Sequence, residues 1–191
     1  LGEVGGSFKA GPVTGRAALY RMNLEDEIAY DGSLFSNVNL DKTRRQGLEL
    51  EGDWRIVPSV LARLTYTYTD ATFREGFYDG KQIPLVPNNK AAARLTWDGD
   101  ALGAYTVVVN YVGRQYYSGD FANALEKMPG YTTADFMASW NIKPFSVSAR
   151  LLNAFDKKYS PYAGYSTFQS DYYYYPADGR TFLMTASYNF R

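Results

Sequence analysis

The chain has 191 residues, and its 20 lysines and arginines balance 20 aspartates and glutamates, so the formal net charge is zero. This balance gives no electrostatic basis for binding nucleic acid. Cysteine and histidine are both absent, which excludes disulfides and thiolate metal sites and removes the commonest general base.

Apolar and polar residues alternate with a period of two along most of the chain, as is typical of β-strands with one apolar face. In chain order, the alternation predicts nine strands, near residues 3–10, 16–30, 43–57, 60–73, 89–98, 102–117, 131–142, 145–155 and 180–190. The pattern places one set of side chains on the apolar face: Tyr66, Val107, Phe136, Met184 and Phe190. It places a second set on the opposite, polar face: Arg63, Asn110, Asp135 and Thr185.

The lengths of these strands favour a membrane barrel. Each is near or above the roughly 9–11 residues that a tilted strand needs to cross a bilayer, whereas strands of soluble proteins average about 5–6 residues. Tight turns at 11–15, 58–59, 99–100 and 143–144 alternate with long links at 31–42, 74–88, 118–130 and 156–179. Outer-membrane barrels have short periplasmic turns and long extracellular loops. A soluble β-sandwich would also alternate inside and outside, but nothing in it requires unequal loops.

Aromatic residues make up 17% of the chain, and tyrosine leads with 18 copies. Tyrosine has an apolar body and a polar tip, so it suits the boundary between lipid and water. Several aromatic residues fall on the predicted apolar face, mostly near strand ends: Tyr66, Tyr68, Trp97, Tyr105, Tyr111, Trp140, Tyr188 and Phe190. We interpret them as the aromatic girdles of an all-β, up-and-down antiparallel transmembrane β-barrel segment, a single unit over residues 1–191.

Glu49, Glu51 and Asp53 form a row of carboxylates on one strand face. They could bind a cation or act as an acid–base pair, but the spacing matches no calcium loop. We expect instead that they face the lumen and pair with Arg63 or Arg94. No histidine is present to activate a serine or threonine, and no nucleophile or phosphate-loop motif occurs. The sequence therefore predicts no enzymatic activity, no metal centre and no cofactor.

Five stretches, in this order, resemble motifs of one known family. They are "EVGGSFKAG" (3–11), "NVNLDKTRRQGLELEGDWRI" (37–56), "YTYTDATF" with "GKQIPLVPNNKAAARLTW" (66–97), "LLNAFDKKYSPYAGYS" (151–166) and "GRTFLMTASYNF" (179–190). The chain is similar to the C-terminal part of the TonB-dependent outer-membrane receptors. It departs from them where Arg191 follows Phe190, because the family usually ends on an aromatic residue. Residues 176–180 are also two residues longer than the family's Pro-Gly-Arg turn.

The resemblance implies a part of a 22-stranded barrel in the Gram-negative outer membrane, with the plug domain and other barrel strands contributed by sequence N-terminal to it. It implies uptake of a scarce metal chelate, first of all a ferric siderophore, with energy delivered through TonB. Alternatives are a receptor for cobalamin or another nutrient, a passive porin-like channel and a structural barrel. The expected partners are outer-membrane lipid, the plug and remaining strands, TonB and the chelate. Alone, the chain would expose unpaired strand edges, so we do not expect it to work as a transporter.

Aromatic and basic residues at the ends of the long links are candidate ligand contacts on extracellular loops. The candidates are Arg114, Tyr116 and Tyr117, Tyr78, Tyr165 and Phe168 in "YAGYSTF", and the run Tyr172, Tyr173, Tyr174 and Tyr175. Ring faces and a guanidinium suit a large or anionic chelate, although packing between loops would use the same residues. Consecutive strand residues point to opposite faces. The four tyrosines should therefore split into two alternating pairs, one toward the lipid boundary and one toward the vestibule above the lumen.

Overall fold

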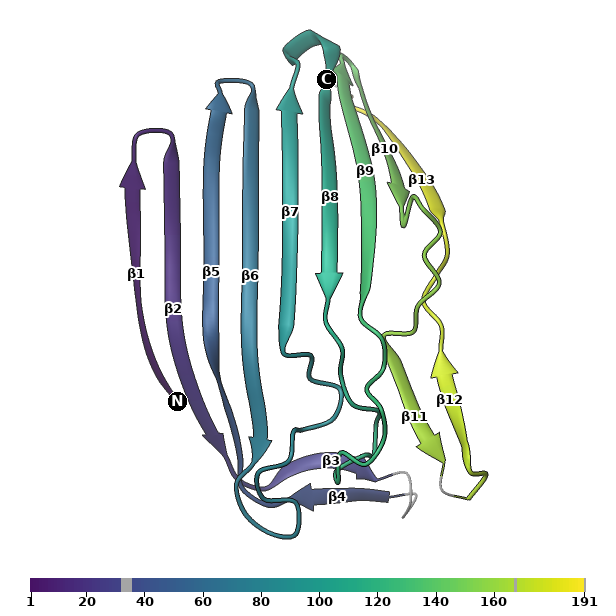
Figure 1. Cartoon of the computed structure of the whole chain (residues 1–191). Helices are drawn as coiled ribbons and strands as arrows, with labels where there is room; N and C mark the ends of the chain where they lie inside the picture. The colour runs from purple at the N-terminus through teal and green to yellow at the C-terminus, as the bar shows by residue number, and fades with distance from the viewer. Residues whose placement is uncertain (32–35, 167, 191) are drawn as a thin grey trace.

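The computed structural model describes residues 1–31, 36–166 and 168–190. Nine long strands form one antiparallel sheet in which every strand lies beside its neighbours in an up-and-down order (Figure 1). The strands are β1 (Gly2–Ala10), β2 (Val13–Leu24), β5 (Thr43–Val57), β6 (Val60–Phe73), β7 (Asn89–Asp98), β8 (Ala104–Val112), β9 (Tyr131–Ile142), β10 (Phe145–Leu152) and β13 (Thr181–Tyr188). β1 and β13 form the two edges and do not pair with each other, so the described sheet is open.

The strand bounds follow the alternation closely where it is regular. The predicted strands at 43–57, 60–73, 89–98 and 131–142 coincide with β5, β6, β7 and β9. The single strand predicted over 16–30 is wrong, because β2 ends at Leu24 and Asp26 turns the chain with a φ of 56°. β10 also ends early, because Asn153 adopts a left-handed φ of 47°. The alternation of apolar and polar residues continues past Asp26 and Asn153, but the extended backbone is interrupted by their left-handed φ angles.

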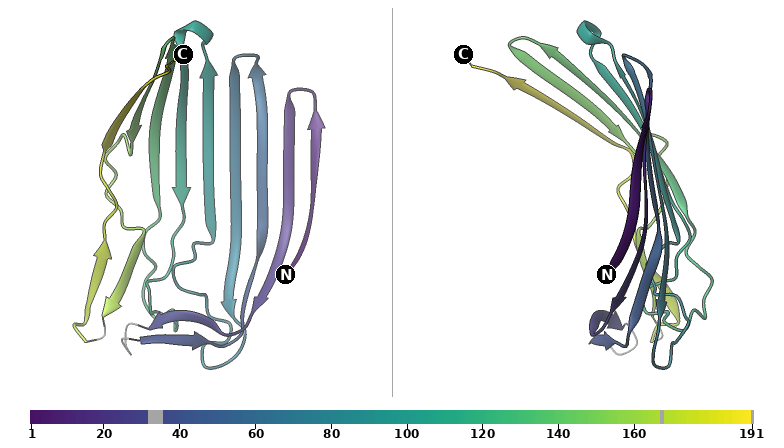
Figure 2. Two further views of the ribbon diagram at one scale, coloured as in Figure 1. Left: turned by 180° about the vertical axis from the view of Figure 1, so that it is seen from behind. Right: turned by 90° about the vertical axis from the view of Figure 1, so that its left-hand side faces the viewer.

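The pairing register confirms the two predicted faces. Residues directly opposed on neighbouring strands share a face. Tyr66 is paired with Leu50 and Ala91, and Phe136 is paired with Val107 and Leu151. On the other face, Arg63 lies opposite both Asp53 and Arg94. Figure 2 shows that the sheet is twisted and curved, with β10 and β13 swinging away from the plane of the first strands.

The two ends of the sheet differ as predicted. Tight connections lie at one end, and one of them contains a short 3₁₀ helix, η1 (Asp100–Leu102). The long links lie at the other end, where two of them fold into hairpins (Figure 1). These hairpins pair β3 (Glu27–Asp31) with β4 (Ser36–Leu40) and β11 (Tyr162–Ser166) with β12 (Asp171–Tyr175). The alternation predicted neither hairpin. In the described part of the chain, no helix is long and apolar enough to span a membrane.

An aromatic row marks the apolar face near the tight turns. The rings of Trp97 and Tyr105 stack with centroids 5.5 Å apart, and Trp140 meets Tyr105 edge-on at 6.0 Å. The indole Nε1 of Trp140 donates a hydrogen bond of 3.2 Å to the Tyr105 hydroxyl. Such rings, with apolar bodies and polar tips, match the girdle expected at one membrane interface.

Candidate functional site

The mouth of the sheet, at the end with the long links, contains most of the buried apolar side chains. A first loop cluster combines residues from four segments that are distant in sequence: Leu40, Ala71, Phe73, Ile83 and Phe121. Phe73 is 2% exposed, and its ring centroid lies 5.8 Å from those of both Tyr78 and Phe121. An open sheet has no interior of its own, so this burial holds the loops against the end of the sheet.

The β3–β4 hairpin is fastened to the polar face of the sheet. The Glu27 carboxylate accepts hydrogen bonds of 2.9 Å from Arg45 Nη1 and from Thr43 Oγ1, and it also accepts one from Arg45 Nη2. The Arg45 guanidinium holds the pKa of Glu27 below its usual value. Arg45 and Thr43 lie opposite Ala71 and Phe73, on the face that carries Arg63. The hairpin therefore crosses the polar side of the sheet at its mouth, as the left view of Figure 2 shows.

A second loop cluster lies beside the β11–β12 hairpin and consists of Tyr117, Met128 and Ala163. The backbone of Ser118 donates a hydrogen bond to the carbonyl of Ala163 at 2.9 Å, which ties the link after β8 to the hairpin. Burial raises the pKa of the Tyr117 hydroxyl, with a further contribution from its hydrogen bond to Tyr174. Tyr117 therefore stays protonated at neutral pH.

The tyrosine run splits into two alternating pairs, as extended backbone requires. The Tyr172 and Tyr174 rings face Tyr117, with centroids 4.7 and 6.3 Å away. Tyr173 and Tyr175 instead face Tyr162, at 6.4 and 5.3 Å. Burial raises the pKa of Tyr173 to about 12. A neutral phenol can stack or donate a hydrogen bond, but it is a poor metal ligand.

Two cations lie close to the second loop cluster. Lys127 Nζ sits 4.7 Å from the centroid of the Tyr116 ring and donates a hydrogen bond of 2.6 Å to Gln82 Oε1. Burial and the neighbouring charge of Arg114 lower the pKa of Lys127. Two like charges side by side create a positive potential, which attracts an anion. Sequence reasoning found Arg114 but missed Lys127, since only the folded loops bring Lys127 beneath Tyr116.

The "NAFDKKY" motif has a structural role that its spacing did not reveal. Asn153 is 6% exposed, and its amide donates hydrogen bonds to the carbonyls of Lys157 and Asp178. Its backbone donates a 2.8 Å hydrogen bond to Asp135 on β9, and Asp156 accepts one of 2.9 Å from the Arg180 backbone. The motif therefore joins the start and end of the longest link to the sheet.

The predicted ligand contacts occupy three kinds of environment. Tyr78 and Tyr117 pack within or against the loop clusters. Several others present exposed surface at the mouth: Arg114, Phe168, Tyr172, Tyr174 and Tyr175. Tyr116, Tyr165 and Tyr173 are half-buried. Thr167, in the same "YAGYSTF" stretch, and Arg191 lie outside the described residues. The structure brings Tyr165, Tyr172, Tyr174 and Tyr117 together, and their contact with a ligand stays a prediction.

The carboxylate row on β5 forms ion pairs on the polar face, as expected. Arg63 donates hydrogen bonds of 2.6 and 2.8 Å to the two oxygens of Asp53, and its Nε lies 3.8 Å from Glu51. The alternative partner, Arg94, makes no ion pair within the described part of the chain. No group of three acidic side chains that could hold a metal ion occurs among the described residues. These charges lie together on the polar face of the sheet.

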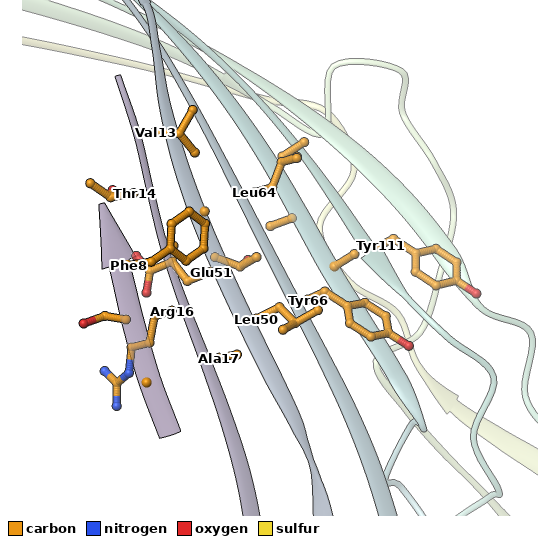
Figure 3. A pocket seen from close by; sticks show the side chains of 18 of the residues that line it. Phe8, Val13, Thr14, Arg16, Ala17, Leu50, Glu51, Leu64, Tyr66 and Tyr111 are labelled. Atoms are coloured by element: carbon orange, nitrogen blue, oxygen red, sulfur yellow. The ribbon is translucent and has the colours of Figure 1, made fainter. Parts of the chain in front are cut away.

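A broad hollow of about 750 Å³ lies on the apolar face of the sheet. Figure 3 shows Phe8, Leu50, Leu64 and Tyr66 around it. Gly52 leaves open space in this part of the surface, whereas the ring of Phe8 lies over the neighbouring Gly15. Because it opens on the lipid-facing side and its lining is almost wholly apolar, it is not a candidate ligand site.

Comparison with known proteins agrees with this geometry. A family model described as "TonB dependent receptor-like, beta-barrel" matches residues 2–154. The chain is 29% identical over 160 residues to the ferrichrome outer membrane transporter/phage receptor of Escherichia coli K12, covering 78% of this chain and 21% of that protein. It is 28% identical over 187 residues to the catecholate siderophore receptor Fiu of the same strain, covering 91% and 23%.

Among solved structures, the ferric yersiniabactin uptake receptor FyuA from Yersinia pestis superposes with a TM-score of 0.79 at 26% identity, covering 99% of this chain and 29% of that one. The chain thus spans roughly a fifth to a quarter of the length of the curated relatives that it matches.

Proposed function

The chain belongs to the TonB-dependent receptor family of outer-membrane β-barrels, and from this premise we propose that it forms part of the wall and mouth of a receptor for a scarce metal chelate, first of all a ferric siderophore. The relatives support the ligand class, because their names refer to ferrichrome, catecholate siderophores and ferric yersiniabactin. These three ligands differ chemically, so the relatives do not identify the chelate.

The observation that carries the proposal is the composition of the mouth. Tyr172 and Tyr174 present partly exposed rings that pack on Tyr117, and the next residue, Tyr116, contacts Lys127, whose neighbouring cation is Arg114. Aromatic faces stack on flat or apolar groups at the surface of a large ligand, and a guanidinium binds an anionic ligand through charge-assisted hydrogen bonds. An iron chelate that is bulky and carries negative charge matches both features.

The polar face of the sheet would complete the pathway. Its charged side chains, including Arg63, Asp53 and Glu51, would face the plug in the whole receptor. TonB would act through the plug, so that a bound chelate passes inward only when energy is supplied. Both partners are part of this proposal.

The test is uptake by the whole receptor that contains this chain. We would express it in cells that lack other receptors and supply a panel of radiolabelled ferric chelates of the hydroxamate, catecholate and phenolate classes, together with cobalamin. The expected result is uptake of one iron chelate that stops when TonB is deleted. Uptake of cobalamin alone would support the alternative function, a receptor for cobalamin or another nutrient. Uptake that persists without TonB would refute the receptor function in favour of a passive channel.

A further inference from the structure

The polar face of the sheet is divided into two surfaces of different chemistry. On β2, β5, β6 and β7 it carries six charged residues, which we call the charged wall: Arg16, Glu49, Glu51, Asp53, Arg63 and Arg94. On β9, β10 and β13 it carries five hydroxyl residues, which we call the hydroxyl wall: Ser139, Ser146, Ser148, Thr185 and Ser187. The register through β8 keeps both walls on one face, because Thr106 lies opposite Thr96 of β7 and Met137 of β9.

The hydroxyl wall is hollowed and lies near the tight turns. Ser148 is paired with both Ser139 and Thr185, so short side chains adjoin one another across three strands. A hollow of about 400 Å³ is lined by all five hydroxyl residues. Asp98, at the end of β7, and Asp100, in η1, also line it. The acidic groups therefore lie at the turn, while the wall itself is neutral.

The hydroxyl groups keep their hydrogen-bonding capacity for whatever lies in the lumen. Within residues 1–31, 36–166 and 168–190, no side-chain hydrogen bond joins any of the five to another protein group, and each residue is exposed or half-buried. On the charged wall, by contrast, Arg63 donates hydrogen bonds of 2.6 and 2.8 Å to Asp53. A hydroxyl offers one donor and two acceptor positions to water. The hydroxyl wall is therefore a neutral surface that water can cover.

A plug in the lumen would hold to the two walls with different strength. Hydrogen bonds between ionised groups are roughly twice as strong as neutral ones, and a charge left without its partner in a confined space is costly. A serine hydroxyl that the plug releases can bind water instead. Separation of the plug from the barrel should therefore require less free energy at the hydroxyl wall than at the charged wall.

On the basis of the uptake function proposed above, we propose that the chelate crosses the lumen along the hydroxyl wall, between the plug and strands β9, β10 and β13, while the plug stays in contact with the charged wall. An anionic chelate on the charged wall would be retained by Arg16 and Arg94 and repelled by Glu51. Neutral hydroxyls do neither. Arg150, two residues from Ser148 towards the mouth, would draw the anion to this side of the lumen.

The experiment places single cysteines on the two walls of the whole receptor, in cells that have no other receptor for iron chelates. The chain itself contains no cysteine, and any cysteine elsewhere in the receptor is replaced by serine. Ser148→Cys and Thr185→Cys report on the hydroxyl wall. Thr65→Cys and Ala92→Cys, which lie opposite each other beside Glu51, are the matched controls, because they remove no charge from the charged wall.

The probe is a maleimide dye that is too large for porins, so that it reaches these thiols only from the extracellular side. Its rate of reaction is measured with and without TonB, in the presence of the ferric hydroxamate, catecholate or phenolate chelate that the same cells take up. Labelling of the denatured receptor checks that all four thiols can react. Chelate uptake is measured in every variant before and after labelling.

A minor conformation is populated in about 10% of molecules or fewer, so a path that opens during uptake should raise the labelling rate about tenfold or more. We expect this increase at Ser148→Cys and Thr185→Cys when both TonB and the chelate are present, and an unchanged rate at Thr65→Cys and Ala92→Cys. The bulky label should then block uptake from the hydroxyl wall and leave uptake intact on the charged wall.

Equal increases at both walls would overturn the inference, because the plug would then leave the lumen as a whole. An increase only at the charged wall, or none at either wall while the chelate still enters the cell, would place the route elsewhere and also overturn it. Those results would leave the proposed function standing. Absence of TonB-dependent uptake in the wild type would instead refute the proposed function, and this inference with it.

Discussion

Replacing Phe73 with alanine should release the loops at the mouth from the sheet. Phe73 is 2% exposed and contacts the ring of Phe121 in the first loop cluster and the ring of Tyr78, which packs against that cluster. Removal of a buried phenylalanine side chain costs about 3–5 kcal/mol. About 1.4 kcal/mol corresponds to a tenfold change in an equilibrium constant. The population of the open form of the cluster should therefore rise a hundredfold or more.

The assay is amide hydrogen exchange of the whole receptor, read by mass spectrometry over residues 71–83. Two hydrogen bonds report directly on the cluster, from Ile83 N to the Ala71 carbonyl at 2.9 Å and from Phe73 N to the Lys81 carbonyl at 3.0 Å. Phe77→Ala is the matched control, because Phe77 is in the same link but is 91% exposed. We expect fast exchange in Phe73→Ala and nearly wild-type exchange in Phe77→Ala. If the two variants exchange alike, the loops are held by contacts other than this cluster.

Three further predictions test the faces, the hairpin and the tyrosine run. Leu64→Arg should lower the free energy of unfolding of the receptor, measured in urea, by about 2–4 kcal/mol if Leu64 lies near the bilayer midplane. The control is Thr65→Arg, which should have little effect because Thr65 lies on the polar face beside Glu51. Equal losses of stability in the two variants would contradict the assignment of the two faces. Because Arg45 keeps the pKa of Glu27 below its ordinary 4.5, the ion pair should stabilise the β3–β4 hairpin fully above about that pH and be lost as pH falls through the lowered pKa. The protection of residues 36–40 against hydrogen exchange, taken relative to the intrinsic exchange rate at each pH, should therefore fall in acid, and Glu27→Gln should be weakly protected at every pH; protection equal to the wild type in Glu27→Gln would exclude this role. Alanine at both Tyr172 and Tyr174 should change chelate affinity differently from alanine at both Tyr173 and Tyr175, since the pairs face opposite sides of the hairpin; if neither double variant alters binding in a filter assay, the run is scaffold.

The long strands could be predicted from the sequence because their signal is local. A strand that crosses a membrane repeats the same choice of apolar and polar side chain every two residues, so Leu64, Tyr66 and Tyr68 define a face without knowledge of any partner strand. The ends of β5 and β6 followed from the same pattern. The ion pair between Arg63 and Asp53 could also be predicted from the sequence, because both charges fall on the polar face of adjacent strands.

The mouth depended on contacts that no local pattern encodes. Phe73, Phe121 and Leu40 meet only because three links fold back on the same end of the sheet. Lys127 becomes a neighbour of Tyr116 in the same way. Tyrosines have the same appearance in a sequence whether they stack on a ligand or on another loop, so the packed Tyr117 and the exposed Tyr175 could not be told apart.

The pairing of β2 with β5 shows the same division. The alternation places Arg21 and Arg44 on the apolar face of their own strands, yet it does not say which residues lie beside them. Only the register of β2 against β5 makes the two arginines diagonal neighbours. Periodicity determines the face of a residue, because side-chain direction is a property of the extended backbone. Neighbours across strands are determined by hydrogen-bond register, which is a property of the assembled sheet.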